Sequence, residues 1–177
     1  MEIIFEEATS PVLVNALREN QLDFCLLLTS NIKHDDDLKI ETFIRSPRKL
    51  WTPIGHPLQS QSVVNLSDVE KSPFLLLITD EYPEVIQDYW QARGCVPDIQ
   101  FRTNSFEAIR SLVAQGKGVT ILSDLVYRPW SLEGLRVMRR TIDDCVTYMD
   151  VGVVSTLSKP FSPDCQRLVD FLRQRIT

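Results

Sequence analysis

The segment "TNSFEAIRSLVAQGKGVTILS", residues 103–123, decides the fold class. Ser105 stands where an N-cap is expected, and apolar residues then recur at helical spacing on one face. Gly116 is placed to end that helix in the left-handed conformation, Gly118 lets the chain reverse, and residues 119–122 form a short apolar run of strand length. The segment therefore predicts a helix, a glycine hinge and a buried strand.

The same alternation of strand and helix runs along most of the chain. Strands are predicted at "EIIFE" (2–6), "LDFCLLLT" (22–29), "FLLLIT" (74–79) and "DIQFRT" (98–103). Helical patterns separate these runs, and several of the runs are apolar on both faces. Continuous apolar strands joined by helices are typical of a parallel sheet that is covered on both sides. The sequence therefore predicts an α/β fold.

The stretch between the second and third of these strands is less regular. Residues 31–39, "NIKHDDDLK", are polar and acidic and predict a surface loop, and one short strand is expected near residues 49–53. Two βαβ halves, with a C-terminal helix that returns to the first, predict two lobes with the second inserted into the first. We expect lobe I to comprise residues 1–71 and 153–177, and lobe II to comprise residues 72–152.

Composition narrows the class of protein. The formal net charge is -5 and the pI is about 5.1, which argues against extended contact with nucleic acid through this chain. No apolar run approaches the roughly 18 residues of a membrane span. The N-terminus, "MEIIFEEATS", carries acidic residues where a secretory signal needs a basic region. We expect a soluble cytoplasmic chain without membrane contact.

Signals for catalysis, metals and cofactors are weak. Four cysteines, at positions 25, 95, 145 and 165, match no zinc spacing, and we interpret them as free thiols. Residues 34–37, "HDDD", cannot all converge on one ion, and "QGKG" lacks the remaining residues of a phosphate-binding loop. The sequence predicts no metal site and no cofactor, and it offers no catalytic constellation that would indicate an enzyme.

Four segments, taken in order, resemble a known family. These are "EIIFEEATSPVLVNALRENQLDFCLLL", "GHPLQSQSVVNLSDVEKSPFLLL", "FRTNSFEAIRSLVAQGKGVTILS" and "LSKPFSPDCQRLVDFLRQRI". The chain is similar over nearly its whole length to the effector-binding domain of LysR-type bacterial transcriptional regulators. The resemblance implies the type 2 periplasmic-binding-protein fold, in which two α/β lobes close on a small ligand.

The resemblance also implies partners. We expect a small-molecule effector, a homodimer or tetramer, and contact with DNA only through a helix-turn-helix domain that is absent from this chain. The first strand and helix of the family's effector domain, which precede a segment like "EIIFEE", are also expected to be missing here. Family members usually carry proline where this chain has Ser123.

Candidate ligand contacts follow from the predicted strand ends. In open α/β sheets, ligands gather at the carboxyl ends of the strands, and the unpaired amides after Ser105 favour an anion. In the family these positions resemble effector contacts. The predicted ligand-binding residues are Thr29, Ser30, Thr79, Thr103, Asn104, Ser105 and Ser123. Ser105 has a second interpretation as a plain helix cap, and the turn with Tyr127, Arg128 and Trp130 either adds a wall to the site or packs within its lobe.

Two other function classes remain open at this point. A solute-binding protein of a transporter would have the same fold but needs an export signal. An enzyme on the same two-lobed architecture would show turnover of a small acid. The leading hypothesis is a regulatory domain in which a small effector, expected to be anionic, shifts the population between two arrangements and so changes DNA binding.

Overall fold

The computed structural model describes residues 2–32, 35–79, 82–144 and 147–176. The chain divides into two compact units, which we describe separately. Unit 1 comprises residues 1–46 and 149–177, and unit 2 comprises residues 47–148. The chain therefore passes between the units twice, after Ser46 and before Met149.

Unit 1 is built on a three-stranded sheet with the order β1-β8-β2. Its elements are α1 (Ser10–Arg18), β1 (Cys25–Leu28), the short 3-10 helix η1 (Thr29–Asn31), β2 (Leu38–Ser46), β8 (Met149–Thr156) and α5 (Pro163–Ile176). Both strand pairs are antiparallel. The parallel sheet predicted for the strand at 22–29 is therefore wrong for this unit, because the neighbour of β1 comes from the far end of the chain.

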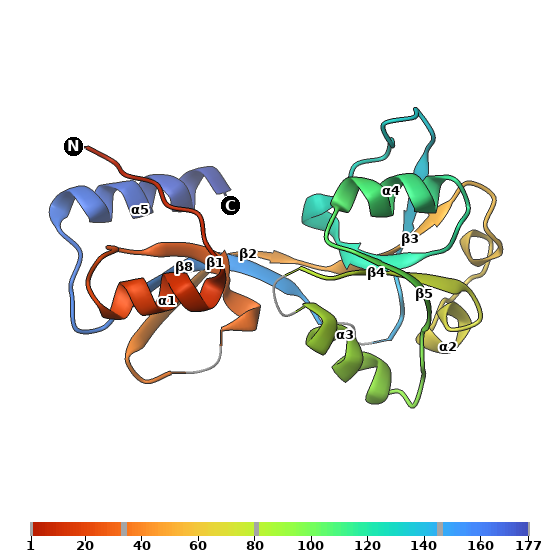
Figure 1. Ribbon diagram of the computed structural model, residues 1–177, viewed down its shortest axis with the longest axis horizontal. Helices are drawn as coiled ribbons and strands as arrows, with labels where there is room; N and C mark the ends of the chain where they lie inside the picture. Colours follow the sequence, from red (N-terminus) through yellow and green to blue (C-terminus); the bar gives the residue numbers. More distant parts are fainter. Residues whose placement is uncertain (1, 33–34, 80–81, 145–146, 177) are drawn as a thin grey trace. The chain divides into compact units, whose positions relative to one another are not determined.

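Each face of this sheet has its own helix (Figure 1). Leu13 and Leu17 of α1 pack with Cys25 and Leu27. Val169 of α5 packs with side chains that point to the opposite face, Phe43 and Val153. Adjacent residues of a strand face opposite ways, so these two small apolar clusters lie on the two sides of one sheet.

The strand predicted at residues 2–6 is not formed. Residues 2–9 carry no helix or strand, and Ile4 and Phe5 are 79% and 87% exposed. The β-forming composition of "EIIFE" does not make a strand without a neighbouring strand to pair with, because strand preference reflects packing against neighbours. Among the described strands, β1 pairs only with β8.

Strand β2 was missed by the sequence analysis, which placed a surface loop up to residue 39 and the next strand near residue 49. Its signal is the alternation of Leu38 and Ile40 with the polar residues Lys39 and Glu41, which is the period of a strand. A register shift between Thr42 and Ile44 interrupts the pairing with β8. The acidic loop before β2 hid this alternation.

Unit 2 contains the elements predicted from the opening segment. Its elements are β3 (Arg48–Pro53), the 3-10 helix η2 (Pro57–Gln59), α2 (Leu66–Val69), β4 (Pro73–Leu77), α3 (Tyr82–Gln91), β5 (Asp98–Thr103), α4 (Phe106–Ala114), β6 (Thr120–Ser123), the 3-10 helix η3 (Asp124–Val126) and β7 (Val137–Arg140). The strands predicted at 74–79 and 98–103 are confirmed, as is the strand near 49–53.

The strands of unit 2 form two sheets that one bridge connects. Strands β4 and β5 are parallel, and β6-β3-β7 is antiparallel. A parallel bridge between Phe74 and Val119 joins β4 to the start of β6. Figure 1 shows α4 on one side of these strands and α3 on the other. The core is a single cluster that includes Trp51, Phe74 and Ile109, each with 0% exposure.

The two glycines of the opening segment serve different purposes. Gly116 has a φ of 75°, the left-handed conformation expected where a helix ends. A Cβ atom at Gly118 would lie 2.6 Å from the carbonyl oxygen of Pro73. Gly118 therefore permits the close approach of β4 and the chain that enters β6, and this packing role replaces the chain reversal that we expected.

The unit bounds differ from the lobe bounds that we predicted. Residues 47–71 fall in unit 2, whereas the prediction placed them in lobe I. The physical reason is the pairing of β3 with β6 and β7, which no local pattern reveals. In the described part of the chain, no helix is both long enough and apolar enough to cross a membrane.

Candidate functional site

Three strand ends of unit 2 lie at the same edge. Strands β4 and β5 are parallel, with Leu77 paired to Thr103, and the amide of Ile78 donates to the carbonyl of Thr103 at 2.8 Å. The bridge at Phe74 makes β6 parallel to β4 as well. Thr79, Thr103 and Ser123 therefore follow or end parallel strands at one edge. The sequence predicted strand ends at Thr79 and Thr103, whereas for Ser123 it predicted only a hydroxyl near the ligand site.

The N-terminus of α4 lies at this edge. The amide of Ser105 donates to Thr103 Oγ1 at 3.1 Å, and the amide of Ala108 donates to Ser105 Oγ at 3.2 Å. Ser105 is therefore the N-cap of α4, as predicted. These bonds use both hydroxyl oxygens as acceptors, so each hydroxyl hydrogen can still be donated to a ligand. Asn104 is exposed beside them.

Ser123 is used within the fold. Its side chain is buried, with 1% exposure, and its Oγ accepts from the amide of Leu125 at 3.1 Å, which caps η3. Ser123 also pairs with Arg48 at the start of β3. A contact between this hydroxyl and a ligand stays a prediction.

The turn after η3 packs inside unit 2. The rings of Tyr127 and Trp51 meet edge to face at 5.4 Å, and Tyr127 Oη donates to the carbonyl of Val137 at 2.7 Å. Burial raises the pKa of the Tyr127 phenol. Arg110 ties α4 to this turn by donating to the carbonyl of Val126 at 3.2 Å. We expected this turn either to add a wall to the ligand site or to pack within its lobe. For Tyr127, the second interpretation describes the contacts.

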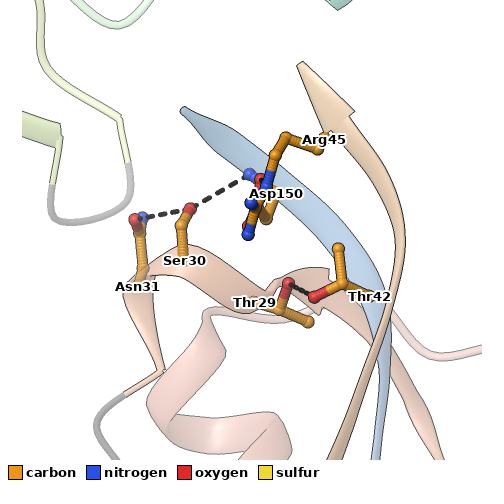
Figure 2. A network of polar contacts seen from close by, with 6 residues as sticks. All are labelled: Thr29, Ser30, Asn31, Thr42, Arg45 and Asp150. Carbon is orange, nitrogen blue, oxygen red and sulfur yellow. Dashed lines mark hydrogen bonds and ion pairs between the residues drawn. The ribbon is translucent and has the colours of Figure 1, made fainter. Parts of the chain in front are cut away.

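The strand end of unit 1 carries a polar network (Figure 2). Thr29, which is 7% exposed, shares a hydrogen bond with Thr42 at 3.1 Å between the two Oγ1 atoms. Ser30 is exposed; its Oγ donates to Asn31 Oδ1 at 3.4 Å and accepts from the amide of Asp150 at 3.3 Å. Ser30 is thus the more accessible of the two predicted contacts in this unit.

Sequence reasoning missed two charged residues of this network. Arg45 lies at the end of β2, and Asp150 lies at the start of β8. They are paired in register, and Arg45 Nη2 is 3.1 Å from Asp150 Oδ2. The sequence could have indicated both residues, because each is a charged residue within a segment that otherwise has the pattern of a strand. Their meeting depends on a pairing between segments far apart in the chain.

The structure thus brings the predicted residues together in two groups. Thr79, Thr103, Asn104, Ser105 and Ser123 form the group in unit 2, and Thr29 and Ser30 form the group in unit 1. A cavity of about 350 Å³ in unit 2 is lined by Ser62–Val64 and by residues around Arg140, and a second of about 590 Å³ lies along α5 in unit 1. Neither is lined by the predicted residues. A ligand site made by both groups stays a prediction.

Catalytic and metal-binding groups were also sought in the described residues. No group of three or more His, Cys, Asp or Glu side chains is placed there to hold a metal ion. His56 Nδ1 accepts from the amide of Leu58 at 3.3 Å and caps η2, and burial lowers the His56 pKa. Cys25, Cys95 and Cys165 are buried free thiols. His34, Asp80 and Cys145 lie outside the described residues.

Comparison with known proteins gives one consistent family. The family model of the LysR substrate binding domain matches residues 1–177. Among curated proteins, the transcriptional dual regulator GltC of Bacillus subtilis is 23% identical over 177 residues, which are 98% of this chain and 57% of GltC. The chain therefore spans little more than half the length of that relative. The relatives are transcriptional regulators, which does not favour the transporter or enzyme alternatives.

Solved structures agree on the fold. The C-terminal domain of a probable LysR family regulator from Rhodococcus sp. RHA1 matches with a TM-score of 0.84 at 22% identity, covering 97% of this chain and 83% of that one. The regulatory domain of Synechocystis CcmR in complex with 2-PG matches at 0.76 and 18% identity, with 96% and 80% covered. The effector binding domain of QuiR in complex with shikimate matches at 0.73 and 15% identity, with 96% and 78% covered.

These likenesses identify the α/β fold as the periplasmic-binding-protein-like fold of LysR effector-binding domains. The match of the family model to every residue of the chain identifies the family itself. The chain belongs to the LysR substrate binding domain family.

Proposed function

We propose that this chain is the effector-sensing part of a LysR-type transcriptional regulator and that it binds a small organic anion. The observation that carries the proposal is the shared edge of unit 2. There Thr79, Thr103 and Ser105 gather at the ends of parallel strands and at the N-terminus of α4. Hydroxyl donors next to the unpaired amides of a helix are suited to a carboxylate or phosphate.

Two structural neighbours support the chemical class of the ligand. QuiR was solved with shikimate, which is a carboxylate, and CcmR was solved with 2-PG. The sequence identities of 15% and 18% are too low to transfer either ligand to this chain. The proposal therefore names a class, a small organic acid, rather than a compound.

We extend the proposal from this chain to a longer protein of which the chain would be a part. We propose that binding changes the DNA contacts of a helix-turn-helix domain in a longer protein, since GltC is a regulator of which this chain covers 57%. We also propose a homodimer or tetramer, a cytoplasmic location and no catalytic activity. Light scattering on the purified chain tests the oligomeric state, and a turnover assay with each bound ligand tests the absence of catalytic activity.

A thermal-shift screen of carboxylates and organic phosphates, including shikimate and 2-PG, tests the proposal. Bound ligand raises the apparent melting temperature by mass action, and the shift grows with ligand concentration. A positive ligand is then tested with Thr103→Val, which removes one hydroxyl and keeps the shape of the side chain. Thr141→Val is the matched control. It removes a threonine hydroxyl that is not among the predicted ligand contacts and that accepts a hydrogen bond from Lys49 Nζ at 2.9 Å.

The expected result is a melting-temperature shift that Thr103→Val reduces and Thr141→Val preserves. No shift with any acid in the screen contradicts the proposal. A shift that both variants preserve contradicts the placement of the ligand at the edge of unit 2.

A further inference from the structure

Arg45 and Asp150 stand at the two places where the chain leaves unit 1. Strand β2 ends at Ser46, one residue after Arg45, and β8 begins at Met149, one residue before Asp150. The bounds of unit 1 fall at the same two residues, Ser46 and Met149. The ion pair therefore joins the outgoing strand to the returning strand at the crossings themselves.

The two partners differ in exposure. The Arg45 side chain is 67% exposed, whereas the Asp150 side chain is 14% exposed. Arg45 Nη2 is 3.1 Å from Asp150 Oδ2, and Arg45 Nε is 3.3 Å and 3.4 Å from the two carboxylate oxygens. The carboxylate is thus held in the fold, whereas most of the Arg45 side chain faces solvent, where a second anion can approach it.

Asp150 is also the residue that joins this ion pair to a predicted ligand contact. Its amide donates to Ser30 Oγ, and Ser30 in turn donates to Asn31 (Figure 2). Asp150 therefore contacts both the Arg45 guanidinium and the Ser30 hydroxyl, and the Asn31 amide side chain extends this network through Ser30. A guanidinium matches the geometry of carboxylate and phosphate with parallel N–H donors.

We propose that Arg45 is the cationic residue with which unit 1 selects an anionic effector, and that Asp150 is the competing carboxylate that holds Arg45 when no effector is bound. The inference rests on the proposed function and adds a residue and a mechanism to it. The effector anion takes N–H donors of Arg45 from Asp150, and it takes the Ser30 hydroxyl hydrogen from Asn31 Oδ1. This exchange changes the tie between β2 and β8 at the two crossings, which gives effector binding a direct route to the segments that connect the units.

The alternative role for this pair is a purely structural salt bridge. Exposed ion pairs contribute little to stability and are screened by salt. The two roles make opposite predictions for Asp150. If Asp150 competes with the effector, removing its charge strengthens anion binding. If the pair only braces the strands, removing either partner loosens the same brace and weakens binding.

The experiment uses Arg45→Gln, Arg45→Lys and Asp150→Asn in the full 177-residue chain. The probes are shikimate, 2-PG, citrate and inorganic phosphate, with dissociation constants measured by isothermal titration calorimetry at low and physiological salt. Circular dichroism and melting temperature check the fold of each variant. Arg18→Gln is the matched control, because Arg18 forms exposed ion pairs with Asp35 and Asp37 elsewhere in unit 1.

We expect Arg45→Gln to raise the dissociation constant of the bound anion about tenfold or more, as for loss of a charge-assisted hydrogen bond. Arg45→Lys should recover part of that loss, and Asp150→Asn should lower the dissociation constant severalfold. Arg18→Gln should leave it unchanged.

The outcomes separate this inference from the proposed function. Binding that Arg45→Gln leaves unchanged overturns the role of Arg45 and leaves the proposed function standing. Weaker binding in both Arg45→Gln and Asp150→Asn identifies a structural brace and also overturns the inference. If no probe binds the wild-type chain, the proposed function fails and the inference fails with it.

Discussion

The two units hold their candidate ligand contacts with cores of very different size. Unit 2 packs its helices, among them α3 and α4, and its strands around one continuous cluster, with Trp51, Phe74 and Ile109 fully buried. Unit 1 has two small clusters, one on each face of a three-stranded sheet, and it leaves Phe5 87% exposed. Buried apolar area is the main source of stability, so we expect unit 2 to be the more stable unit.

The largest predicted effect is on the core of unit 2. Phe74→Ala should lower the free energy of unfolding by about 3–5 kcal/mol, because Phe74 is fully buried and its ring meets Trp90 at 5.7 Å. Phe101→Ala on the neighbouring strand is the matched control, since Phe101 is 44% exposed. Urea unfolding followed by tryptophan fluorescence measures both. Equal losses in the two variants would refute the assignment of this core.

A substitution in unit 1 sharpens the comparison. All three tryptophans, Trp51, Trp90 and Trp130, lie in unit 2, so their fluorescence reports that unit alone. Leu17→Ala should cost unit 1 about 2–4 kcal/mol, because Leu17 is 1% exposed in the cluster under α1. The far-UV circular dichroism transition should shift and the fluorescence transition should not. Matching shifts would mean that the chain unfolds as one unit.

The close approach at Gly118 gives a smaller effect. Gly118→Ala places a Cβ atom 2.6 Å from the Pro73 carbonyl oxygen, and overpacking of this kind costs about 1–3 kcal/mol. A Cβ atom at Gly134 would have no other atom within 4 Å. Gly134→Ala should therefore lower the free energy of unfolding only through the backbone strain at a φ of 74°, by about 1 kcal/mol. The fluorescence transition measures both, and a neutral Gly118→Ala would contradict the strand packing.

The smallest effect is a pH dependence in unit 1. Burial raises the pKa of the Cys25 thiol to about 11, above its ordinary value in an unfolded chain. As the pH rises, the Cys25 thiol therefore loses its proton in the unfolded state before it does so in the folded state. The free energy of unfolding should then decline by about 1 kcal/mol between about pH 9 and 11, and this contribution should be fully present below pH 9. The circular dichroism transition should fall less steeply over this range in Cys25→Ala. Identical slopes would assign the decline to other groups.

Sequence patterns predicted unit 2 well because its elements are specified locally. Ser105 caps α4 and Gly116 ends the helical segment with a left-handed residue, and both depend on residues within one turn. The predicted strands β4, β5 and β6 then lie at the expected positions. The parallel pairing of β4 with β5 also follows from the alternation of strand and helix, whereas β6 pairs with β3 in the antiparallel direction.

Unit 1 was predicted less well because its contacts are distant in sequence. Strand β1 pairs with β8, which lies more than a hundred residues further along the chain, and "EIIFE" has a strand composition without a strand partner. The pair of Arg45 and Asp150 depends on the same kind of contact. Periodicity reveals which residues form a strand but not which strand lies beside it.

The most direct test of the account is a residue-resolved NMR titration of the 15N-labelled chain with the strongest ligand from the thermal-shift screen. The account predicts that amide shifts change most at Ser30, Asn31 and Asp150 in unit 1, and at Thr103 to Ser105 in unit 2. The largest changes around Arg140 or along α5, where the two cavities lie, would contradict it.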